Sequence, residues 1–570
     1  MPQPTPPHAT ESLVNLVVNP DRAELLKSLS REFYDITLNP RQLCDLELLA
    51  SGAFTPLDGF MTRSDYESVL DRMRLQSGVL FPLPICLDVP EAVAVHLESG
   101  QSVTLRDPEG FLLAVLHIQE IWKPDLEREA REVFGTSNPD HPGVHRFLHT
   151  TGEHYVGGQL EVLSLPLHFD FKADRLTPAE MRQVFARLGW QRVVAFLTRH
   201  PIHRPQFAMT LEAMRRADAN LLVLPIVGMT RPGDFDHYIR VRCYKAVGHH
   251  YPPDSQTMNL LPLAMRMAGP REALLHGIIS KNFGATHVIV GPDHAGAGKD
   301  GNGQGFYSDN AAREALDTFS EEIGIRVVPF SEMVYLPFED EFRFEEDVPK
   351  DAQFISMSGS DIRTRIDSGR RIPQWITFPE VVAEIRKGHP PPRKRGFTVF
   401  MTGLSGAGKS TIAKVLYAKF LERGDRPVSL LDGDIVRRHL SSKLSFSKED
   451  RDINVRRIGF VASEVTKNRG IAICAPIAPY EATRREIRMA IEEYGGFFEV
   501  HVATPIEECE KRDRKGMYAK ARAGLITGFT GVDDPYETPA APEIRIDTTS
   551  ITPEEAAQRI LVVLGQRGYL

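Results

Sequence analysis

Short apolar runs divided by turn residues characterise the first 165 positions of the chain. Residues 80–87, 102–105 and 112–116 are rich in apolar and β-branched side chains, and clusters of Gly, Pro and polar residues separate them. Such runs are typical of β-strands joined by turns. We therefore predict that residues 1–165 form a β-rich domain with a few helices, in which Val156-Gly157-Gly158 is a hairpin turn.

The pattern changes after residue 165, where apolar runs alternate with helix-like stretches. Residues 193–197, 221–227 and 287–290 are short enough for strands and apolar enough to be buried on both faces, as the strands of parallel sheets are. Residues 166–335 are therefore predicted to form a layered α/β domain. A smaller α/β segment at 336–388 carries two predicted helices, at 361–368 and 379–387.

A proline run followed by basic residues separates this segment from the rest of the chain. Residues 388–395 are typical of a connector with a stiff centre, so we place a linker at 389–395 and a last domain at 396–570. A nucleic-acid-binding patch is the alternative. The chain has 68 Lys and Arg against 76 Asp and Glu, with a net charge of −8, which favours a solvated connector and no nucleic-acid partner.

Composition argues against several other classes. The five cysteines are scattered without a C-x-x-C pair, which favours neither a disulfide framework nor a zinc site. The first ten residues are polar and Pro-rich, and no stretch approaches 18 consecutive apolar residues. We therefore expect a multidomain cytoplasmic protein with no membrane partner.

Residues 403–410 fit the phosphate-binding pattern G-x-x-x-x-G-K-[ST] at every position. A β-prone run at 397–401 precedes them and a helix-like stripe at 411–421 follows, which disfavours the alternative of an ordinary Gly-rich turn. In such a loop, backbone N–H groups at a helix N-terminus bind phosphate, the Lys reaches the β- and γ-phosphates, and the Ser holds Mg²⁺. The predicted ATP-binding residues are Gly403, Ser405, Gly406, Ala407, Gly408, Lys409, Ser410 and Thr411, with Lys409 catalytic and Ser410 a Mg²⁺ ligand.

Two carboxylates follow the next predicted strand. Residues 429–431 end at Asp432-Gly433-Asp434, at the sheet edge where parallel folds bind ligands. Beside a triphosphate, Asp434 is predicted to accept the hydroxyl proton of the acceptor and to bind Mg²⁺, while Asp432 orients the Mg²⁺ shell or Lys409. A surface turn is the alternative reading.

Two basic clusters follow in the same domain. Phosphoryl transfer needs cations that offset developing negative charge, and clusters beside a phosphate loop favour that role over the alternative of solvated helix faces. The first cluster is Arg437, Arg438, Arg451, Asn454, Arg456 and Arg457, and the second spans residues 512–522.

A family resemblance rests on the phosphate loop and on the segments 431–437, 446–451, 454–457, 512–518 and 528–537. Over about residues 393–570 the chain resembles adenosine 5′-phosphosulfate (APS) kinase. The resemblance implies a P-loop NTPase-type kinase fold, and transfer of the ATP γ-phosphoryl group to the 3′-hydroxyl of APS with Mg²⁺. The product is 3′-phosphoadenosine 5′-phosphosulfate (PAPS). Family members often carry Ser where this chain has Ala478, so direct transfer is expected. By position, the resemblance assigns Arg437, Arg451, Asn454, Ile477 and Lys515 to APS and Arg512 to ATP, with residues 515–522 in a lid.

A second resemblance rests on the segments 43–49, 52–61, 155–158, 268–273 and 378–382. Residues 1 to about 388 resemble ATP sulfurylase, which makes APS and pyrophosphate from ATP and sulfate. This implies a PUA-like N-terminal domain and a Rossmann-like nucleotidyltransferase domain, with ATP, APS, sulfate and pyrophosphate as small-molecule partners. Both families imply a homo-oligomer. The sulfurylase-like site residues are Thr198, Arg199, His200, His203, Gln206, Asp293, His294 and Ala295.

The sulfurylase-like motifs depart from the family pattern. Leu197 replaces an amide donor, His200 an Asn, Gln206 a second His and Pro292 a second cation. Loss of one preorganised donor or charge typically costs about 10² to 10³ in rate. We therefore expect a working APS kinase joined to a sulfurylase-like domain whose activity is weak or lost. The open alternatives are a fully active bifunctional enzyme, or an N-terminal region kept as an oligomerisation or nucleotide-binding scaffold.

Overall fold

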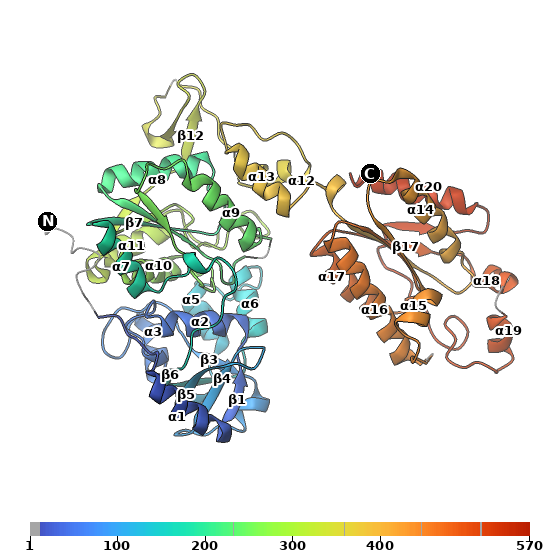
Figure 1. The fold of residues 1–570 in the computed structure, drawn as a ribbon, viewed down its shortest axis with the longest axis horizontal. Coiled ribbons are helices and arrows are strands. Elements are labelled where there is room, and N and C mark those ends of the chain that lie inside the picture. Colours follow the sequence, from blue (N-terminus) through green and yellow to red (C-terminus); the bar gives the residue numbers. More distant parts are fainter. Residues whose placement is uncertain (1–11, 232, 351, 358, 446, 514–515) are drawn as a thin grey trace. The chain divides into compact units, whose positions relative to one another are not determined.

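The computed structural model describes residues 12–570 except residues 232, 351, 358, 446, 514 and 515. Contacts divide the chain into two compact units (Figure 1). The first unit comprises Met1–Met357 and Pro373–Glu384, and the second comprises Ser358–Ile372 and Ile385–Leu570. The domain boundaries proposed from the sequence stay predictions.

A six-stranded sheet forms the core of the N-terminal, β-rich part of the first unit. Its strand order is β1-β4-β5-β6-β2, and β3 pairs with β6. The pairing of β1 with β4 is parallel and the others are antiparallel. The strands are β1 (Tyr34–Thr37), β2 (Gly59–Phe60), β3 (Leu87–Val89), β4 (Ser102–Arg106), β5 (Leu112–Trp122) and β6 (His154–Val162).

Two local predictions in this domain are wrong. Residues 156–158 lie inside β6 rather than in a hairpin turn. A side chain at Gly157 would lie 2.2 Å from the carbonyl oxygen of Met61, so this glycine serves close packing against a neighbouring segment. Residues 81–86 form no strand, because Pro82 and Pro84 have no N–H to donate to a ladder.

The central α/β domain is built around a five-stranded sheet. The strand order is β11-β10-β7-β8-β9, and every pairing is parallel. Residues 193–197 of the middle strand are buried, as their apolar run predicts. The strands are β7 (Val193–Thr198), β8 (Asn220–Pro225), β9 (Gln256–Met258), β10 (His287–Val290) and β11 (Arg326–Pro329), followed by the antiparallel pair β12 (Met333–Leu336) and β13 (Glu341–Phe344).

Several helices around these sheets begin directly after an N-cap residue that can be recognised in the sequence. Asn39 and Thr177 each form a capping box with the residue three positions on, and a proline follows each cap. The helices as far as residue 388 are α1 (Pro20–Leu29), α2 (Pro40–Ala50), α3 (Arg63–Arg72), α4 (Glu91–Ala94), α5 (Leu126–Phe134), α6 (Pro142–Thr150), α7 (Pro178–Leu188), α8 (Arg204–Ala217), α9 (His237–Gly248), α10 (Pro270–Asn282), α11 (Ala311–Ile323), α12 (Gly359–Asp367) and α13 (Pro379–Gly388).

The second unit contains a five-stranded parallel sheet with helices on both faces (Figure 1). Its order is β15-β16-β14-β17-β18. One core includes residues of α14 and α20, and another includes residues of α16 and α17. The strands are β14 (Phe397–Thr402), β15 (Val428–Asp432), β16 (Ile471–Ala475), β17 (Gly496–Val502) and β18 (Ile544–Ile546). The helices are α14 (Lys409–Arg423), α15 (Gly433–His439), α16 (Lys448–Lys467), α17 (Glu481–Glu492), α18 (Ile506–Arg512), α19 (Met517–Arg522) and α20 (Pro553–Gln566).

The proline-rich connector makes local contacts within this second unit. Pro392–Lys394 forms a 3₁₀ turn. Arg395 donates to the Pro390 carbonyl oxygen at 2.6 Å and to the Asp367 carboxylate at 3.0 Å. Across the described part of the chain, no helix has the length and apolar character needed to cross a membrane.

Candidate functional site

The phosphate loop joins the carboxyl end of β14 to the start of α14, as its motif requires. Gly403, Gly406 and Gly408 have φ angles of 148°, 76° and 104°, which favour glycine. A side chain at Gly403 would also lie 2.4 Å from the carbonyl oxygen of Val502. The loop therefore depends on glycine both for its backbone angles and for its close packing against β17.

Lys409 is the first residue of α14, and its side chain is buried. Its Nζ donates to the carbonyl oxygens of Gly403 and Leu404, both at 2.8 Å. The ammonium charge is therefore held against the loop at a helix N-terminus, where phosphate groups bind. Ser410 and Thr411 are exposed in the same first turn.

Residues distant in sequence support this loop. The hydroxyls of Thr504 and Thr548 donate to the Ala407 carbonyl oxygen at 3.0 and 2.9 Å. Arg512 donates from Nη1 to the Thr548 hydroxyl at 2.7 Å and from Nη2 to the Thr548 carbonyl oxygen at 2.9 Å. Arg512, predicted to bind ATP, is thus linked to the phosphate loop through one intervening residue, Thr548. The phosphate-loop motif did not predict that these two threonines support the loop.

The segment predicted to be a lid also contacts the loop. Tyr518 of α19 donates to the carbonyl oxygen of Ser405 at 3.0 Å. Lys515, predicted to contact APS, lies outside the described residues. Arg437, on α15, donates to the Ser445 carbonyl oxygen at 3.1 Å.

Asp432 is the last residue of β15 and is buried at the carboxyl edge of the sheet. Asp434 belongs to the first turn of α15, but its side chain lies outside the described part of the structure. A carboxylate and the Ser410 hydroxyl are hard oxygen donors of the kind that Mg²⁺ prefers. The residues present at this edge therefore fit that ion.

Arg451 and Asn454 lie three residues apart, on one face of α16. Arg451 donates to the Gly528 carbonyl oxygen at 2.7 Å and to the Tyr480 hydroxyl at 3.0 Å, and it pairs with Asp534 at 3.0 Å. The Arg451 Nε and the Asn454 Oδ1 are buried without a hydrogen-bond partner among the described residues. Because buried polar atoms are normally paired, this donor and this acceptor are candidates for contacts with a polar ligand.

Ile477, also predicted to contact APS, lies in the irregular segment after β16. Its carbonyl oxygen accepts hydrogen bonds from the Thr402 hydroxyl at 2.7 Å and from the Gly403 N–H at 3.3 Å. The segment is thereby attached to the strand and loop that carry the phosphate-binding groups. Ile477 and the phosphate loop therefore meet at one edge of the sheet.

In the first unit, the candidate residues begin at the carboxyl end of β7. Thr198 ends the strand, and its hydroxyl donates to the His200 carbonyl oxygen at 3.1 Å. Arg199 Nη1 pairs with both carboxylate oxygens of the buried Asp234, at 2.7 and 2.8 Å. A guanidinium carries five N–H donors, and this pair uses those of Nη1. Arg199 therefore remains a candidate for binding an oxyanion.

His203 and Gln206 form the start of α8. The His203 Nδ1 lies 2.8 Å from the Thr377 hydroxyl, and burial lowers the pKa of His203 to about 4. The Gln206 side chain accepts a hydrogen bond from the His203 N–H at 3.2 Å. Both residues thus stabilise the helix start, and His203 is neutral at pH 7.

A cavity of about 150 Å³ lies beside the loop that follows β10. Asp293 and His294 line it, and the Ala295 backbone has a φ of 57°. The His294 Nε2 lies 2.9 Å from Nδ1 of the buried His276 on α10, and burial lowers the pKa of His294 to about 4. The cavity wall therefore combines a carboxyl group with an imidazole that is neutral at pH 7.

Sequence reasoning missed a second cation, Arg231, near this loop. A side chain at Gly298 would lie 2.8 Å from the Arg231 Nη1. Desolvation raises the pKa of Asp293, and the charges of Arg199 and Arg231 oppose that rise. The positive charges of two arginines therefore favour the ionised form of Asp293 in this loop. The sequence signal that could have identified Arg231 is a basic residue shortly after the apolar run of β8.

The burial of His203 predicts a pH-dependent stability of the first unit. Its pKa is about 4 in the folded chain, against about 6.5 for a solvated imidazole. The contribution of His203 to the free energy of unfolding is fully present above about pH 6.5. It falls as the pH drops toward 4, because the unfolded chain takes up the proton first. At pH 5 protonation of this one group in the unfolded chain lowers the free energy of unfolding by about 2 kcal/mol.

Tryptophan fluorescence can measure this effect. The three tryptophans, Trp122, Trp190 and Trp375, all belong to the first unit, so fluorescence-detected urea unfolding follows that unit. We expect His203→Asn to reduce the stability difference between pH 7 and pH 5 by about 2 kcal/mol. Equal pH dependence in the variant and the unaltered chain would contradict the prediction.

Three family models match successive parts of the chain. A PUA-like domain matches residues 5–165, ATP-sulfurylase matches residues 172–388 and adenylylsulphate kinase matches residues 395–547. Together with the three main sheets, these matches define a multidomain α/β transferase of sulfate activation. The predicted fold class is confirmed.

Relatives match the chain along its whole length. A sulfate adenylyltransferase of Phaeosphaeria nodorum is 47% identical over 568 residues, 99% of each chain, and one of Chaetomium globosum is 48% identical over 538 residues, 94% of each. A solved structure described as hexameric APS kinase from Thiobacillus denitrificans is 39% identical, with 100% of both chains covered and a TM-score of 0.81. The chain belongs to the sulfate adenylyltransferase family, in the form that joins an ATP-sulfurylase domain to an adenylylsulphate kinase domain.

These relatives correct one functional expectation. The departures at Leu197, Gln206 and Pro292 led us to expect weak or lost N-terminal activity, yet the full-length relatives are named for the adenylyltransferase reaction. That expectation is wrong. Leu197 is buried in the core, and Gln206 caps α8, so neither position reports directly on ligand binding. Arg231 also supplies a cation that the motif comparison did not count.

Proposed function

We propose that the chain catalyses two consecutive steps of sulfate activation and uses ATP in both. The first unit converts ATP and sulfate to APS and pyrophosphate, and the second phosphorylates the 3′-hydroxyl of APS to give PAPS. The observation that carries this proposal is that two parallel sheets each present a basic side chain at the carboxyl edge, Arg199 and Lys409. Full-length similarity to proteins named for each step supports it.

In the second unit we assign phosphoryl transfer to the groups around the phosphate loop. Lys409 exchanges its contacts with loop carbonyls for contacts with the β- and γ-phosphates. Ser410 and the carboxylates of Asp432 and Asp434 are the groups that would hold Mg²⁺, which offsets phosphate charge. Asp434 accepts the proton of the 3′-hydroxyl. Ala478 has no hydroxyl to carry a phosphoryl group, so transfer is direct from ATP to APS.

In the first unit we assign sulfate binding to Arg199, because a planar guanidinium matches two oxygens of an oxyanion. The N-terminus of α8 begins five residues later and favours negative charge on the same side of the sheet. The cavity beside Asp293 and His294 is assigned to one part of the nucleotide, since its volume of about 150 Å³ is smaller than a whole ATP molecule. Attack of a sulfate oxygen on the α-phosphorus of ATP then releases pyrophosphate.

Separate assays of the two half-reactions on the purified chain test this proposal. Sulfate-dependent release of pyrophosphate from ATP reports the first step, and conversion of supplied APS with Mg²⁺ and ATP to PAPS reports the second. We expect both activities. Failure of either assay in folded protein would refute the assignment of the corresponding unit.

Asn454 is expected to contribute mainly to APS binding. Its buried Oδ1 makes no hydrogen bond to a described group, and one such bond to a ligand is worth about a factor of ten in affinity. Asn454→Ala should therefore raise the KM for APS about tenfold and leave the KM for ATP unchanged. Asn468→Ala, at the exposed end of the same helix, is the matched control. A similar rise in both constants would contradict this role.

We further propose that the chain forms a homo-oligomer in the cytoplasm. The relative from Thiobacillus denitrificans that matches the whole chain is described as hexameric. Sedimentation equilibrium of the purified chain tests this proposal, and a monomer at micromolar concentration would refute it.

A further inference from the structure

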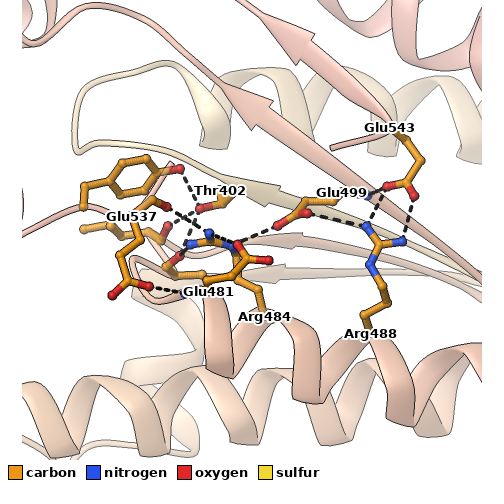
Figure 2. A network of polar contacts seen from close by, with 10 residues as sticks. Thr402, Glu481, Arg484, Arg488, Glu499, Glu537 and Glu543 are labelled. Atoms are coloured by element: carbon orange, nitrogen blue, oxygen red, sulfur yellow. Dashed lines mark hydrogen bonds and ion pairs between the residues drawn. The ribbon is translucent and has the colours of Figure 1, made fainter. Parts of the chain in front are cut away.

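A buried arginine anchors the segment that follows β16 (Figure 2). Arg484 lies on α17, and its side chain is 1% exposed. Its Nη1 donates to the Ala478 carbonyl oxygen at 2.7 Å, and its Nη2 donates to the Glu537 carbonyl oxygen at 2.9 Å. The same Nη2 contacts the carboxylate of Glu481. One guanidinium thus joins two chain segments that are distant in sequence.

The Ala478 backbone is strained, and a second group holds it. Its φ is 46°, a region that residues other than glycine occupy only where their surroundings enforce it. The Thr402 hydroxyl lies 3.1 Å from the Ala478 carbonyl oxygen and 2.7 Å from that of Ile477. Because Thr402 directly precedes the phosphate loop, the strained residue is held between that loop's strand and Arg484.

A buried carboxylate balances the charge of Arg484. The Arg484 Nε and the Glu499 Oε1 are 2.9 Å apart as an ion pair, without the alignment of a hydrogen bond. Burial raises the pKa of Glu499, and Arg484 and Arg488 oppose that rise. Arg488, one turn further along α17, donates to Glu499 at 3.4 Å and to Glu543 at 2.7 and 2.9 Å. Arg488 therefore carries the same charge on the same helix and shares Glu499, but its shorter contacts are with Glu543, where Arg484 contacts the Ala478 and Glu537 carbonyl oxygens (Figure 2).

We propose that Arg484 is a positioning residue for the APS site, an inference that rests on the proposed kinase function. By holding Ala478 in its strained conformation, Arg484 fixes the 477–480 segment against β14. The predicted APS contacts depend on that segment, because Ile477 belongs to it and Arg451 donates to the Tyr480 hydroxyl at 3.0 Å. The Lys409 ammonium contacts the carbonyl oxygens of Gly403 and Leu404, and neither of these accepts from Arg484. APS binding should therefore depend on Arg484 more strongly than ATP binding does.

A pair of double variants tests this proposal in the full chain. Arg484→Met/Glu499→Gln removes both buried charges together, which avoids leaving either one unpaired. Arg488→Met/Glu543→Gln removes a matched pair from the same helix and the segment beyond β17. We expect the first double variant to raise the KM for APS about tenfold or more with the KM for ATP changed less than about twofold, and the second to change either constant less than about twofold.

The outcomes separate the positioning role from a general structural role. Equal effects of the two double variants, or equal changes in both KM values, would overturn the proposal. Arg484→Lys, which keeps the charge but has fewer donors, should show an intermediate KM for APS. Thermal unfolding by circular dichroism identifies a variant that fails to fold, and Arg484→Lys then decides the question.

The unaltered chain distinguishes failure of this inference from failure of the proposed function. If it neither forms PAPS nor binds APS in isothermal titration calorimetry, the kinase assignment fails and the positioning role fails with it. If it forms PAPS while the Arg484 variants bind APS as tightly as the Arg488 control does, only the positioning role is overturned.

Discussion

Replacing Lys409 by methionine is expected to lower the rate of PAPS formation about 10³-fold and to leave sulfate-dependent pyrophosphate release unchanged. The buried ammonium is preorganised by two carbonyl contacts at 2.8 Å at the start of α14. Methionine keeps the length and apolar part of the side chain but offers no charge to the transferring phosphoryl group. Initial rates of both half-reactions, measured on one preparation, check the prediction.

Lys414→Met is the matched control for this substitution. Lys414 lies on the same helix, but its side chain is exposed, so PAPS formation should stay at the rate of the unaltered chain. A Lys409 variant that makes PAPS within about tenfold of that rate would contradict the role of Lys409. Loss of both half-reactions would indicate general unfolding, and circular dichroism checks that the second unit of the variant is folded, because the sulfate-dependent activity reports on the first unit alone.

The phosphate loop illustrates how much of this molecule follows from the sequence. An apolar run, three glycines and an amphipathic stripe predict strand, loop and helix, and the structure places β14 and α14 around a loop whose glycines have positive φ. These features are predictable because each depends on residues within a few positions of one another. The same local reasoning located β7, β8 and β10 of the central sheet.

The groups that hold the loop were not predictable in this way. Thr548 and Thr504 donate to the Ala407 carbonyl oxygen, and Arg484 donates to that of Ala478. Every residue has a carbonyl oxygen, so a donor that binds one leaves no signal of its partner in a single sequence. Such contacts depend on which segments the fold brings together.

The N-terminal site shows a different limit of sequence reasoning. Counting Leu197 and Gln206 as losses assumed that both side chains face a ligand. In the structure, Leu197 packs into the core and Gln206 caps a helix. Side-chain direction at a strand end depends on the register of the whole sheet, and Arg231 reaches the Asp293 loop from the segment that follows β8. A motif comparison detects neither effect.

Replacing Arg199 by methionine, together with Asp234→Asn, is expected to lower sulfate-dependent pyrophosphate release about 10² to 10³-fold. Asp234 is buried, so changing both partners avoids leaving an unpaired carboxylate. The loss follows because no neutral side chain can replace a guanidinium that binds two oxygens of sulfate. Conversion of supplied APS to PAPS by the same protein should be unchanged, since Lys409 and its loop belong to the other unit.

Two further variants sharpen this test of the sulfurylase site. Arg192→Met changes an arginine that pairs with Asp218 at the opposite end of β7, and it should leave pyrophosphate release unchanged. Arg199→Lys keeps the charge but loses the planar fork, so its rate should lie between those of the unaltered chain and the double variant. If the double variant releases pyrophosphate within about threefold of the unaltered chain, sulfate binds elsewhere, because loss of a preorganised cation that binds it directly costs far more than that.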